Sequence, residues 1–402
     1  MTTVDTLIVG AGIVGLATAR EALRRDPDAR LAVLERERTV GAHQTGHNSG
    51  VIHSGLYYTP GSLKARLCVE GRRRLERFCD EHGIPYRRCG KLVIAARRDE
   101  LPRLEALQRR GEANGVNLRR LDADGIPEVE PHARGMAALH VLDTGVTDFT
   151  RVAKALAGEV EALGGTVLTD AMVERVSDAN GRVHVALQDG RTFAAARVIC
   201  CAGAWSDRLA ISSGDDPDPR IVPFRGAYAD VRPERAHLVR ALIYPVPDPA
   251  LPFLGVHLTR SVDDHVHVGP TALPAPARDA YSLRQVRAQD VMDALRWPGT
   301  WRMLYAWRRQ AYQELTTSVS RRALARSAAK YVPAISADDL SPGGAGVRAQ
   351  ALRRDGGLVD DFAVSGSDRI LHVRNAPSPA ATASLALGEL IGDRARIGRT
   401  SH

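Results

Sequence analysis

Residues 7–35 read LIVGAGIVGLATAREALRRDPDARLAVLE, and this stretch decides the fold that the sequence predicts. An apolar run leads into three glycines, and a helix-like segment then leads into a second apolar run that ends in an acid. Gly10, Gly12 and Gly15 have the spacing that permits a tight turn, the approach of a pyrophosphate to the backbone and close helix–strand packing. Glu35 ends the second strand, where a carboxylate can accept hydrogen bonds from a ribose. The stretch therefore predicts a dinucleotide-binding unit rather than a glycine-rich turn of another α/β unit.

The composition is that of an ordinary globular protein. A length of 402 residues suggests two to three domains, and a charged fraction of 25% with 44% hydrophobic residues is typical of soluble chains. The sequence contains no apolar run long enough to span a membrane, and the first strand begins too early to leave room for a signal peptide. Five cysteines without a C-x-x-C pair indicate reduced thiols in a cytoplasmic protein.

The formal net charge of +8 comes mostly from arginine and is spread along the chain. No nucleic-acid-binding motif accompanies it, so we expect small acids or an anionic membrane rather than a nucleic acid as partners. The segment 297–330 carries Trp297, Trp301 and Trp307, and residues 301–330 hold seven Arg or Lys against one acid, Glu314. This pattern predicts peripheral association with the inner face of the cytoplasmic membrane. The alternative is a helix whose tryptophans belong to the core.

The rest of the chain predicts an α/β fold with a discontinuous Rossmann-like domain and an inserted α+β domain. A polar loop, 41–62, follows the first unit, and a loop of that length in a compact domain is usually functional. A second Rossmann-like passage begins near Thr150, and short β-like runs broken by prolines at 221–270 predict a mixed or antiparallel sheet. We therefore assign the nucleotide domain to 1–84, 145–213 and 340–402, and the substrate or cap domain to 85–144 and 214–339.

Two histidines are candidates for the general base. The loop 43–53 contains three histidines, but no acid or cysteine joins them, so we predict no metal site. His53 in this loop and His257 on an expected strand can accept a proton near neutral pH. The alternative for each is a hydrogen-bonded structural histidine.

Three arginines lie in apolar or glycine-rich surroundings and are candidates for binding a carboxylate. A guanidinium binds carboxylates with two parallel hydrogen bonds and stays charged when it is desolvated. We therefore single out Arg225, Arg260 and Arg348, with structural ion pairs as the alternative. The sequence NAPSPAATASLALGEL at 375–390 places a polar loop before a helix, which makes a second N-terminus that favours anions.

Several strings of the sequence resemble a known family. GAGIVG at 10–15, CAGAW at 201–205 and GVRAQ at 346–350 resemble the D-amino-acid oxidase superfamily of FAD-dependent oxidoreductases. Within it, the L-2-hydroxyglutarate dehydrogenase/oxidase group is indicated by the strings at 43–68, 89–95, 217–226, 243–257, 346–362 and 372–384. The resemblance implies FAD and the oxidation of L-2-hydroxyglutarate to 2-oxoglutarate. It also implies that electrons pass to a membrane quinone, to oxygen or to another acceptor.

The resemblance also assigns roles to residues. His53 or His257 is expected to accept the hydroxyl proton of the substrate. Arg348, helped by Arg225 or Tyr244, is expected to hold a carboxylate, and Arg260 is a further candidate for this role. The residues expected at the cofactor are Gly10, Ala11, Gly12, Gly15, Glu35, Arg36, Thr45, His47, Asn48, Ser49, Gly50, Val51, Val173, Ala202, Gly203, Trp205, Gly346, Arg348, Asn375, Pro377, Ser378, Pro379 and Ala380.

Two positions depart from the pattern expected of the group. Ala227 stands where an acidic residue is expected, and Thr271 stands where an asparagine is expected. Either difference can retune the substrate pocket. An oxidase of another 2-hydroxy acid, or of an amino or imino acid, is therefore the alternative enzyme. A flavin-bearing interaction protein without turnover is the alternative outside enzymes.

Overall fold

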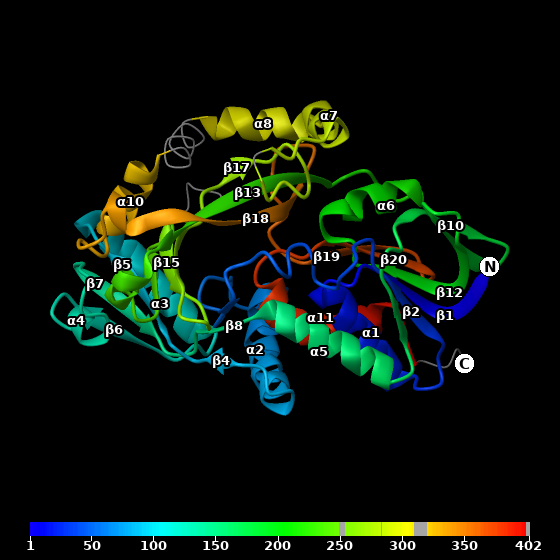
Figure 1. Cartoon of the computed structure of the whole chain (residues 1–402), viewed down its shortest axis with the longest axis horizontal. Coiled ribbons are helices and arrows are strands. Elements are labelled where there is room, and N and C mark those ends of the chain that lie inside the picture. The colour runs from blue at the N-terminus through cyan, green and yellow to red at the C-terminus, as the bar shows by residue number, and fades with distance from the viewer. Residues whose placement is uncertain (249–253, 283, 309–319, 399–402) are drawn as a thin grey trace.

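Two β-sheets, one of eight strands and one of nine, organise the molecule (Figure 1). The computed structural model describes residues 1–248, 254–282, 284–308 and 320–398. Helices pack on the outer faces of both sheets, and a small three-stranded sheet, β3 (Val51–Ile52), β8 (Gly145–Thr147) and β4 (Tyr86–Arg87), completes the β structure. The α/β class expected from the sequence is confirmed.

The eight-stranded sheet contains the predicted nucleotide-binding unit. Its centre is parallel, in the order β20-β12-β1-β2-β9, while the β10–β11 hairpin and β19 add antiparallel edges. The apolar runs of the fingerprint form β1 and β2, which pair in parallel, and the paired residues of both strands are buried. The strands are β1 (Thr2–Val9), β2 (Leu31–Leu34), β9 (Thr166–Leu168), β10 (Val173–Ala179), β11 (Arg182–Leu187), β12 (Thr192–Cys200), β19 (Ala363–Gly366) and β20 (Ile370–Asn375).

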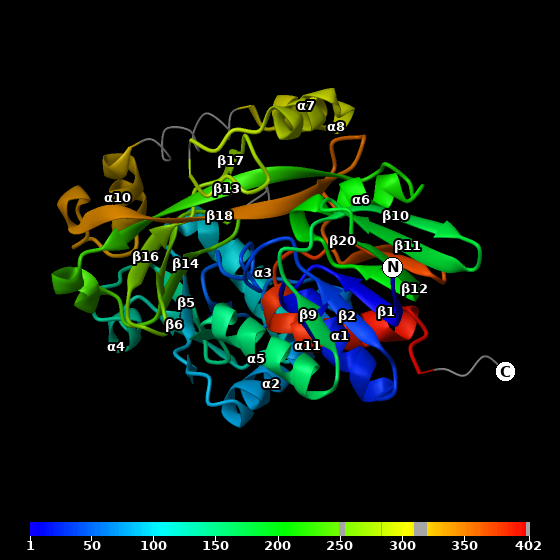
Figure 2. The same cartoon turned by 45° about the vertical axis from the view of Figure 1, so that its right-hand side comes forward.

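Four helices cover one face of this sheet. They are α1 (Ile13–Arg25), α2 (Leu63–Glu81), α5 (Phe149–Ala162) and α11 (Ala380–Arg394). Ser62 and Asp148 cap α2 and α5 by accepting hydrogen bonds from backbone amides. The helix α11 packs against both α1 and α2, so the C-terminal helix lies against the N-terminal unit (Figure 2). The short helix α6 (Ser206–Ser212) lies on the other side, near β10 and β20.

The nine-stranded sheet has the order β17-β13-β16-β15-β14-β5-β7-β6, with β18 also paired to β13. All neighbours are antiparallel except β14 and β5, so the sheet is mixed. The long strands β13 and β18 run side by side in both views (Figures 1 and 2). The strands are β5 (Lys91–Ala95), β6 (Leu118–Asp122), β7 (Ala137–Val141), β13 (Arg220–Val231), β14 (Leu242–Pro245), β15 (His257–Arg260), β16 (Val266–Gly269), β17 (Leu273–Pro274) and β18 (Leu340–Leu352).

Helices also surround the nine-stranded sheet. They are α3 (Leu101–Ala113), α4 (Ile126–Val129), α7 (Ala288–Arg296), α8 (Pro298–Ala306) and α10 (Arg321–Ala329), with the 3₁₀ turns η1 (Arg98–Glu100), η2 (Gly203–Trp205), η3 (Pro233–Leu238) and η4 (Ala337–Asp339) along the chain. Within the described ranges, no helix has the length and apolarity that crossing a membrane requires.

The expected domain division follows the two sheets, with one difference. The strand β18 lies in the segment 340–402, which we assigned to the nucleotide domain, but it pairs along its length with β13 of the nine-stranded sheet. Strand pairing over more than a hundred residues of separation leaves no local mark in the sequence, so the sequence does not reveal that β18 pairs with β13. The division itself remains a proposal, with β18 moved to the substrate side.

Candidate functional site

The turn between β1 and α1 has no room for side chains. Gly10 has a φ of +102°, and a Cβ atom there would lie 2.5 Å from the carbonyl oxygen of Cys201. A Cβ atom on Gly15 would lie 1.9 Å from the carbonyl oxygen of Gly10. Both distances are shorter than any tolerated contact, so only glycine fits either position. The predicted strand–turn–helix geometry of the fingerprint is therefore present.

The N-terminus of α1 presents backbone donors to this turn. The amide of Ala11 donates to Glu35 Oε2 at 2.7 Å, and the amide of Ile13 donates to Thr45 Oγ1 at 3.0 Å. Gly12 occupies the N-cap position without a side-chain cap, and the first turn of α1 contains no acidic residue. A helix N-terminus of this kind attracts a phosphate through its free amides and its dipole. The acidic residue expected at the ribose thus lies beside the expected phosphate site.

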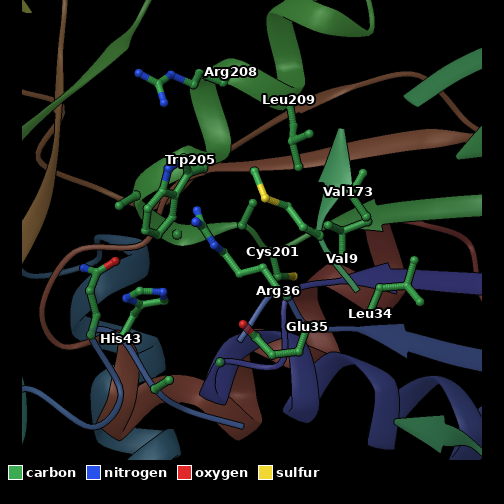
Figure 3. Close-up of a pocket in the computed structure, with 18 of the residues that line it drawn as sticks. Val9, Leu34, Glu35, Arg36, His43, Val173, Cys201, Trp205, Arg208 and Leu209 are labelled. Atoms are coloured by element: carbon green, nitrogen blue, oxygen red, sulfur yellow. The ribbon is translucent and has the colours of Figure 1, made fainter. Parts of the chain in front are cut away.

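A cavity of about 640 Å³ opens beside this turn (Figure 3). The Arg36 guanidinium carbon lies 4.1 Å from the centroid of the Trp205 ring, and both side chains line the cavity with Glu35. The size is in the range of cofactor sites, and the wall is mostly apolar. The lining also includes Gly10, Gly12, Val173, Ala202 and Gly203, all expected at the cofactor. Glycine cradle, uncapped helix and cavity together fit a dinucleotide such as FAD.

The start of α11 forms hydrogen bonds with His53, at the end of the loop 43–53. The His53 amide donates to the Thr382 hydroxyl at 3.1 Å, and Ser378 Oγ lies 3.2 Å from His53 Nε2. The helix has no side-chain cap and no acid in its first turn. This second N-terminus therefore favours negative charge, as the sequence predicted, and it lies next to one of the two candidate bases.

Residues of the nine-stranded sheet and of the segment after it contact His47 in the loop 41–62. The His47 ring stacks on Tyr281 with ring centroids 3.7 Å apart, and Arg225 donates to the Tyr281 carbonyl at 3.3 Å. On β18, a Cβ atom added to Gly346 would lie 2.6 Å from the His47 carbonyl oxygen. The strand that carries Arg348 thus touches the expected cofactor loop with its backbone, and a larger residue at position 346 would separate them.

His257 is oriented for proton transfer. Its ring lies 4.1 Å from the Tyr244 ring, between centroids, and its Nδ1 lies 2.9 Å from the Gly255 carbonyl oxygen. Because a carbonyl oxygen can only accept a hydrogen bond, Nδ1 carries the proton and Nε2 keeps its lone pair. The alternation of β15 places His257 on the same face as Tyr244, opposite the core residue Leu258.

Both candidate bases are neutral at pH 7. Burial lowers the pKa of His53 to about 3, helped by the positive charge of Lys91. Burial likewise lowers the pKa of His257 to about 3, with smaller contributions from Arg348 and Lys91. An imidazole that stays unprotonated at neutral pH can accept a proton. The positive charges of Arg348 and Lys91 thus both contribute to the lowered pKa of His257.

The structure does not bring Arg260 to this cluster. Its guanidinium pairs with Asp264 at 2.8 Å and donates to the carbonyls of Ala236 and Val239. Strand alternation places it on the face opposite His257, so its assignment to the substrate is withdrawn. Arg225 also points away from Arg348, because Arg348 is in register with Phe224, the residue before Arg225.

Two asparagines expected at the cofactor donate hydrogen bonds from their side chains to backbone carbonyls of the protein. Asn48 donates to the carbonyls of Gln44 and Thr45, at 3.1 and 2.6 Å. Asn375 donates to the carbonyls of Val359 and Asp361, both at 2.9 Å. Their side-chain nitrogens therefore hold the backbone in shape. The Asn48 Oδ1 accepts from the Gly50 amide, whereas the Asn375 Oδ1 is buried without a partner among the described residues.

The two departures from the expected family pattern contact each other. The Ala227 amide donates to Thr271 Oγ1 at 3.2 Å, and the Thr271 amide donates to the Ala227 carbonyl at 3.0 Å. Thr271 is buried. The two positions thus form one structural unit at the bulge of β13, and a change at one alters the surroundings of the other.

Sequence reasoning missed three residues of this region. Lys91 and Tyr57 lie beside Tyr244, and Tyr281 covers His47. The one signal for Lys91 was a lysine at the start of the otherwise apolar run KLVIA, all of which is buried. Tyr281 left no signal, because its stacking partner is more than two hundred residues away in the chain.

Comparison with known proteins agrees with this geometry. The chain matches a protein-family model described as FAD dependent oxidoreductase over residues 5–394. It is 46% identical over 410 residues to the mitochondrial L-2-hydroxyglutarate dehydrogenase of Nematostella vectensis, covering 97% of this chain and 90% of that protein. It is 44% identical over 386 residues to L-2-hydroxyglutarate dehydrogenase of Indibacter alkaliphilus, covering 96% of both. Its fold is similar to that of L-alpha-glycerophosphate oxidase from Mycoplasma pneumoniae with FAD bound, with a TM-score of 0.80 and 22% identity over 100% of this chain and 99% of that one.

Proposed function

This chain belongs to the family of FAD-dependent oxidoreductases, and we propose that it oxidises L-2-hydroxyglutarate to 2-oxoglutarate. The support is the identity of 44–46% to dehydrogenases of that name over nearly the whole length of both chains. One structural observation carries the chemistry. The Nδ1 of His257 is bonded to the Gly255 carbonyl, so its Nε2 is free to accept a proton. The positive charge of Arg348 contributes to the lowered pKa of this histidine.

The cofactor would be held mainly by the eight-stranded sheet. The uncapped N-terminus of α1 would bind the pyrophosphate, and Glu35 would accept hydrogen bonds from the ribose. The start of α11, with Ser378 and Pro379 before it, would stabilise negative charge on the flavin ring. When bound, FAD supplies the two-electron acceptor that takes a hydride from the α-carbon of the substrate.

The proton of the substrate hydroxyl goes to His257 in this proposal. The hydrogen bond from Nδ1 to the Gly255 carbonyl fixes the ring so that Nε2 is the accepting atom. His53 has its Nε2 next to the Ser378 hydroxyl, so its role is to orient the loop and the substrate. As the hydroxyl proton leaves and the C–H bond breaks, the carbon–oxygen double bond of the 2-oxo acid forms.

Arg348 would bind the carboxylate next to the reacting carbon. The strand β18 brings it from the substrate sheet to the cofactor loop, where Gly346 contacts the His47 carbonyl. A guanidinium that clamps this carboxylate fixes the α-carbon relative to the base, and such positioning accounts for a large part of a catalytic rate.

A turnover panel tests the substrate. Purified protein is assayed with an artificial electron acceptor against L-2-hydroxyglutarate, L-malate, L-glutamate and glycine, and 2-oxoglutarate is quantified as product. We expect L-2-hydroxyglutarate to have the largest kcat/KM and to give one 2-oxoglutarate per two electrons. A larger kcat/KM for an amino acid would favour the alternative enzyme instead.

We further propose that electrons pass to a membrane quinone at the surface of α7 and α8. Trp297 is a core residue whose indole donates to the Leu352 carbonyl, so it does not serve this purpose. Trp301 and Tyr305 are exposed at 57% and 72%, together with Met292 and Leu295. Residues 309–319 of the basic segment 301–330, Glu314 among them, lie outside the described residues.

Vesicle flotation tests this surface. Wild-type protein should float with vesicles that contain anionic lipid and should be released by salt, because exposed apolar side chains next to arginines suit an anionic interface. The double variant Trp301→Ser, Tyr305→Ser should float less. Equal flotation of both proteins, or none with wild type, would contradict the proposal, and oxygen would then be the acceptor to examine.

A further inference from the structure

Lys91 differs from every other buried cation of the described chain. Five lysine or arginine residues are buried there, and four of them are paired with a carboxylate: Lys64 with Asp360, Arg72 with Asp143, Arg278 with Asp207 and Arg374 with Asp215. Lys91 is only 1% exposed, yet no carboxylate of the described residues pairs with it. A buried charge without a counter-ion is costly, so an unpaired one is rarely kept without a use.

The ammonium group of Lys91 lies against two tyrosine rings. Its Nζ lies 4.3 Å from the centroid of the Tyr57 ring and 5.0 Å from that of Tyr244. Strand alternation in β5 puts Lys91 on the same face as Val93, and Val93 is in register with Tyr244 of β14. Tyr244 contacts His257 on the next strand, so Lys91, Tyr244 and His257 follow one another across one face of the sheet.

The charge of Lys91 reaches both candidate bases. After burial, it is the largest contribution that lowers the pKa of His53, and it also contributes to the lowered pKa of His257. Burial lowers the pKa of Lys91 itself to about 7. An anion placed beside the ammonium would offset this loss of hydration.

Tyr57 supplies a second group for an anion at this place. Its hydroxyl oxygen is buried and has no hydrogen-bond partner among the described residues. Burial raises its pKa well above the ordinary value, so the hydroxyl keeps its proton and can only gain from an acceptor. A buried donor without an acceptor costs free energy that a carboxylate oxygen would recover.

Resting on the proposed function, we propose that Lys91, with the Tyr57 hydroxyl, binds the distal carboxylate of the substrate and so selects a dicarboxylic over a monocarboxylic 2-hydroxy acid. A substrate with two carboxylates needs a separate cationic or hydrogen-bonding partner for each of them. Arg348 and Lys91 both influence His257 but sit on strands far apart in the sheet, β18 and β5. This arrangement gives each carboxylate its own partner, with the base between them.

The test compares two substrates of equal chain length. L-2-hydroxypentanoate has a methyl group where L-2-hydroxyglutarate has its distal carboxylate. Lys91→Met should lower kcat/KM for L-2-hydroxyglutarate by about 100-fold and change that for L-2-hydroxypentanoate by less than about threefold, because only one substrate loses a charge partner. Equal losses for both substrates, or no loss for either, would overturn the proposal.

A matched lysine and a stability measurement separate this role from a structural one. Lys64→Met also removes a buried lysine beside a tyrosine ring, but this lysine is paired with Asp360, so the ratio of the two kcat/KM values should stay unchanged. Lys91→Met should keep its FAD and its Tm, because it removes a buried charge that no carboxylate of the described residues compensates. A Tm that falls by more than a few degrees would assign Lys91 to the core instead.

Binding of glutarate and pentanoate, which carry no hydroxyl group to oxidise, tests the dicarboxylate site separately from the reaction. Glutarate and pentanoate are titrated against the FAD-loaded protein, and the change in flavin absorbance gives each Kd. Wild type should bind glutarate more tightly, and Lys91→Met or Tyr57→Phe should reduce that preference. If wild type binds glutarate in this way but does not oxidise L-2-hydroxyglutarate, the proposed function fails and the dicarboxylate site stands. If glutarate and pentanoate bind equally to wild type, the dicarboxylate site fails.

Discussion

The cofactor turn and the substrate face of the nine-stranded sheet use different chemical groups. At the turn after β1, the group that faces a ligand is the N-terminus of α1 at Gly12, and hydrogen bonds from the neighbouring amides to Glu35 and Thr45 hold the backbone in place. On the substrate face, the groups are side chains from separate strands, such as Lys91, Tyr244 and His257. A backbone site is specified by glycines that are close in sequence, whereas a side-chain site is specified by strand pairing between distant segments.

This difference implies that the two regions can be disrupted separately. A change in the glycine turn removes the cofactor and therefore all activity. A change on the substrate face should leave the cofactor bound and alter only turnover or selectivity. The predictions below test this separation, from the largest expected effect to the smallest.

Gly15→Ala should abolish FAD binding. Its new Cβ would lie 1.9 Å from the Gly10 carbonyl oxygen, so either the turn or α1 must move away from the pyrophosphate site. The absorbance spectrum of the purified variant should lack the flavin bands. Gly158→Ala in α5 is the matched control, because a Cβ there meets nothing within 4 Å. A yellow Gly15→Ala protein with a full complement of FAD would refute the assignment of the turn.

His257→Gln should keep FAD and lose about 10²–10⁴-fold in kcat, the usual contribution of a general base. His265→Gln, on the exposed hairpin after β15, is the control and should behave as wild type. Should His53→Gln cause the larger loss in kcat while His257→Gln causes little, the base would be His53.

The pH dependence of kcat/KM tests the lowered pKa of His257. Because burial lowers the pKa of His257 to about 3, it is neutral from pH 4 upward, and kcat/KM should show no acid limb near pH 6.5 that depends on it. An acid limb with an apparent pKa near 6.5 that disappears in His257→Gln would mean that the base is exposed to water in the free enzyme.

The glycine turn could be predicted from sequence, and much of the substrate face could not. Gly10, Gly15 and Glu35 are near one another in sequence and in space, so their spacing carried the prediction. The importance of Lys91 lies in its lack of a carboxylate partner, which only the packed structure reveals. Arg260 was misassigned because an arginine in an apolar strand looks the same whether it faces a ligand or pairs with Asp264.

Arg348→Met should leave FAD bound and lower kcat/KM for L-2-hydroxyglutarate by about 100-fold, the scale of a charge-assisted pair of about 3 kcal/mol. Unlike Lys91→Met, it should lower kcat/KM for L-2-hydroxypentanoate equally, because both substrates share the carboxylate next to the α-carbon. Steady-state kinetics with both substrates gives the two kcat/KM values. A loss of kcat/KM for L-2-hydroxyglutarate alone would mean that Arg348 binds the distal carboxylate and Lys91 the carboxylate next to the α-carbon.

Arg260→Met should show the smallest kinetic effect. It removes the pair with Asp264 and the donor to the Val239 carbonyl, while the Ala236 carbonyl keeps its bond from the Val239 amide, and the loss costs about 1–3 kcal/mol of stability. Tm should fall by a few degrees while kcat/KM stays within about twofold of wild type. A large rise in KM at unchanged Tm would return Arg260 to the substrate site.

Anaerobic rapid mixing tests the central claim most directly, because it observes only the reaction between substrate and bound cofactor. FAD-loaded wild-type protein and Lys91→Met are mixed with the L and D enantiomers of 2-hydroxyglutarate, and flavin absorbance is followed over time. We predict rapid bleaching of wild type by the L enantiomer alone, and much slower bleaching of Lys91→Met at the same concentration, with FAD equally bound in both. Bleaching of wild type by the D enantiomer at the same rate, or no bleaching by the L enantiomer, would contradict the account.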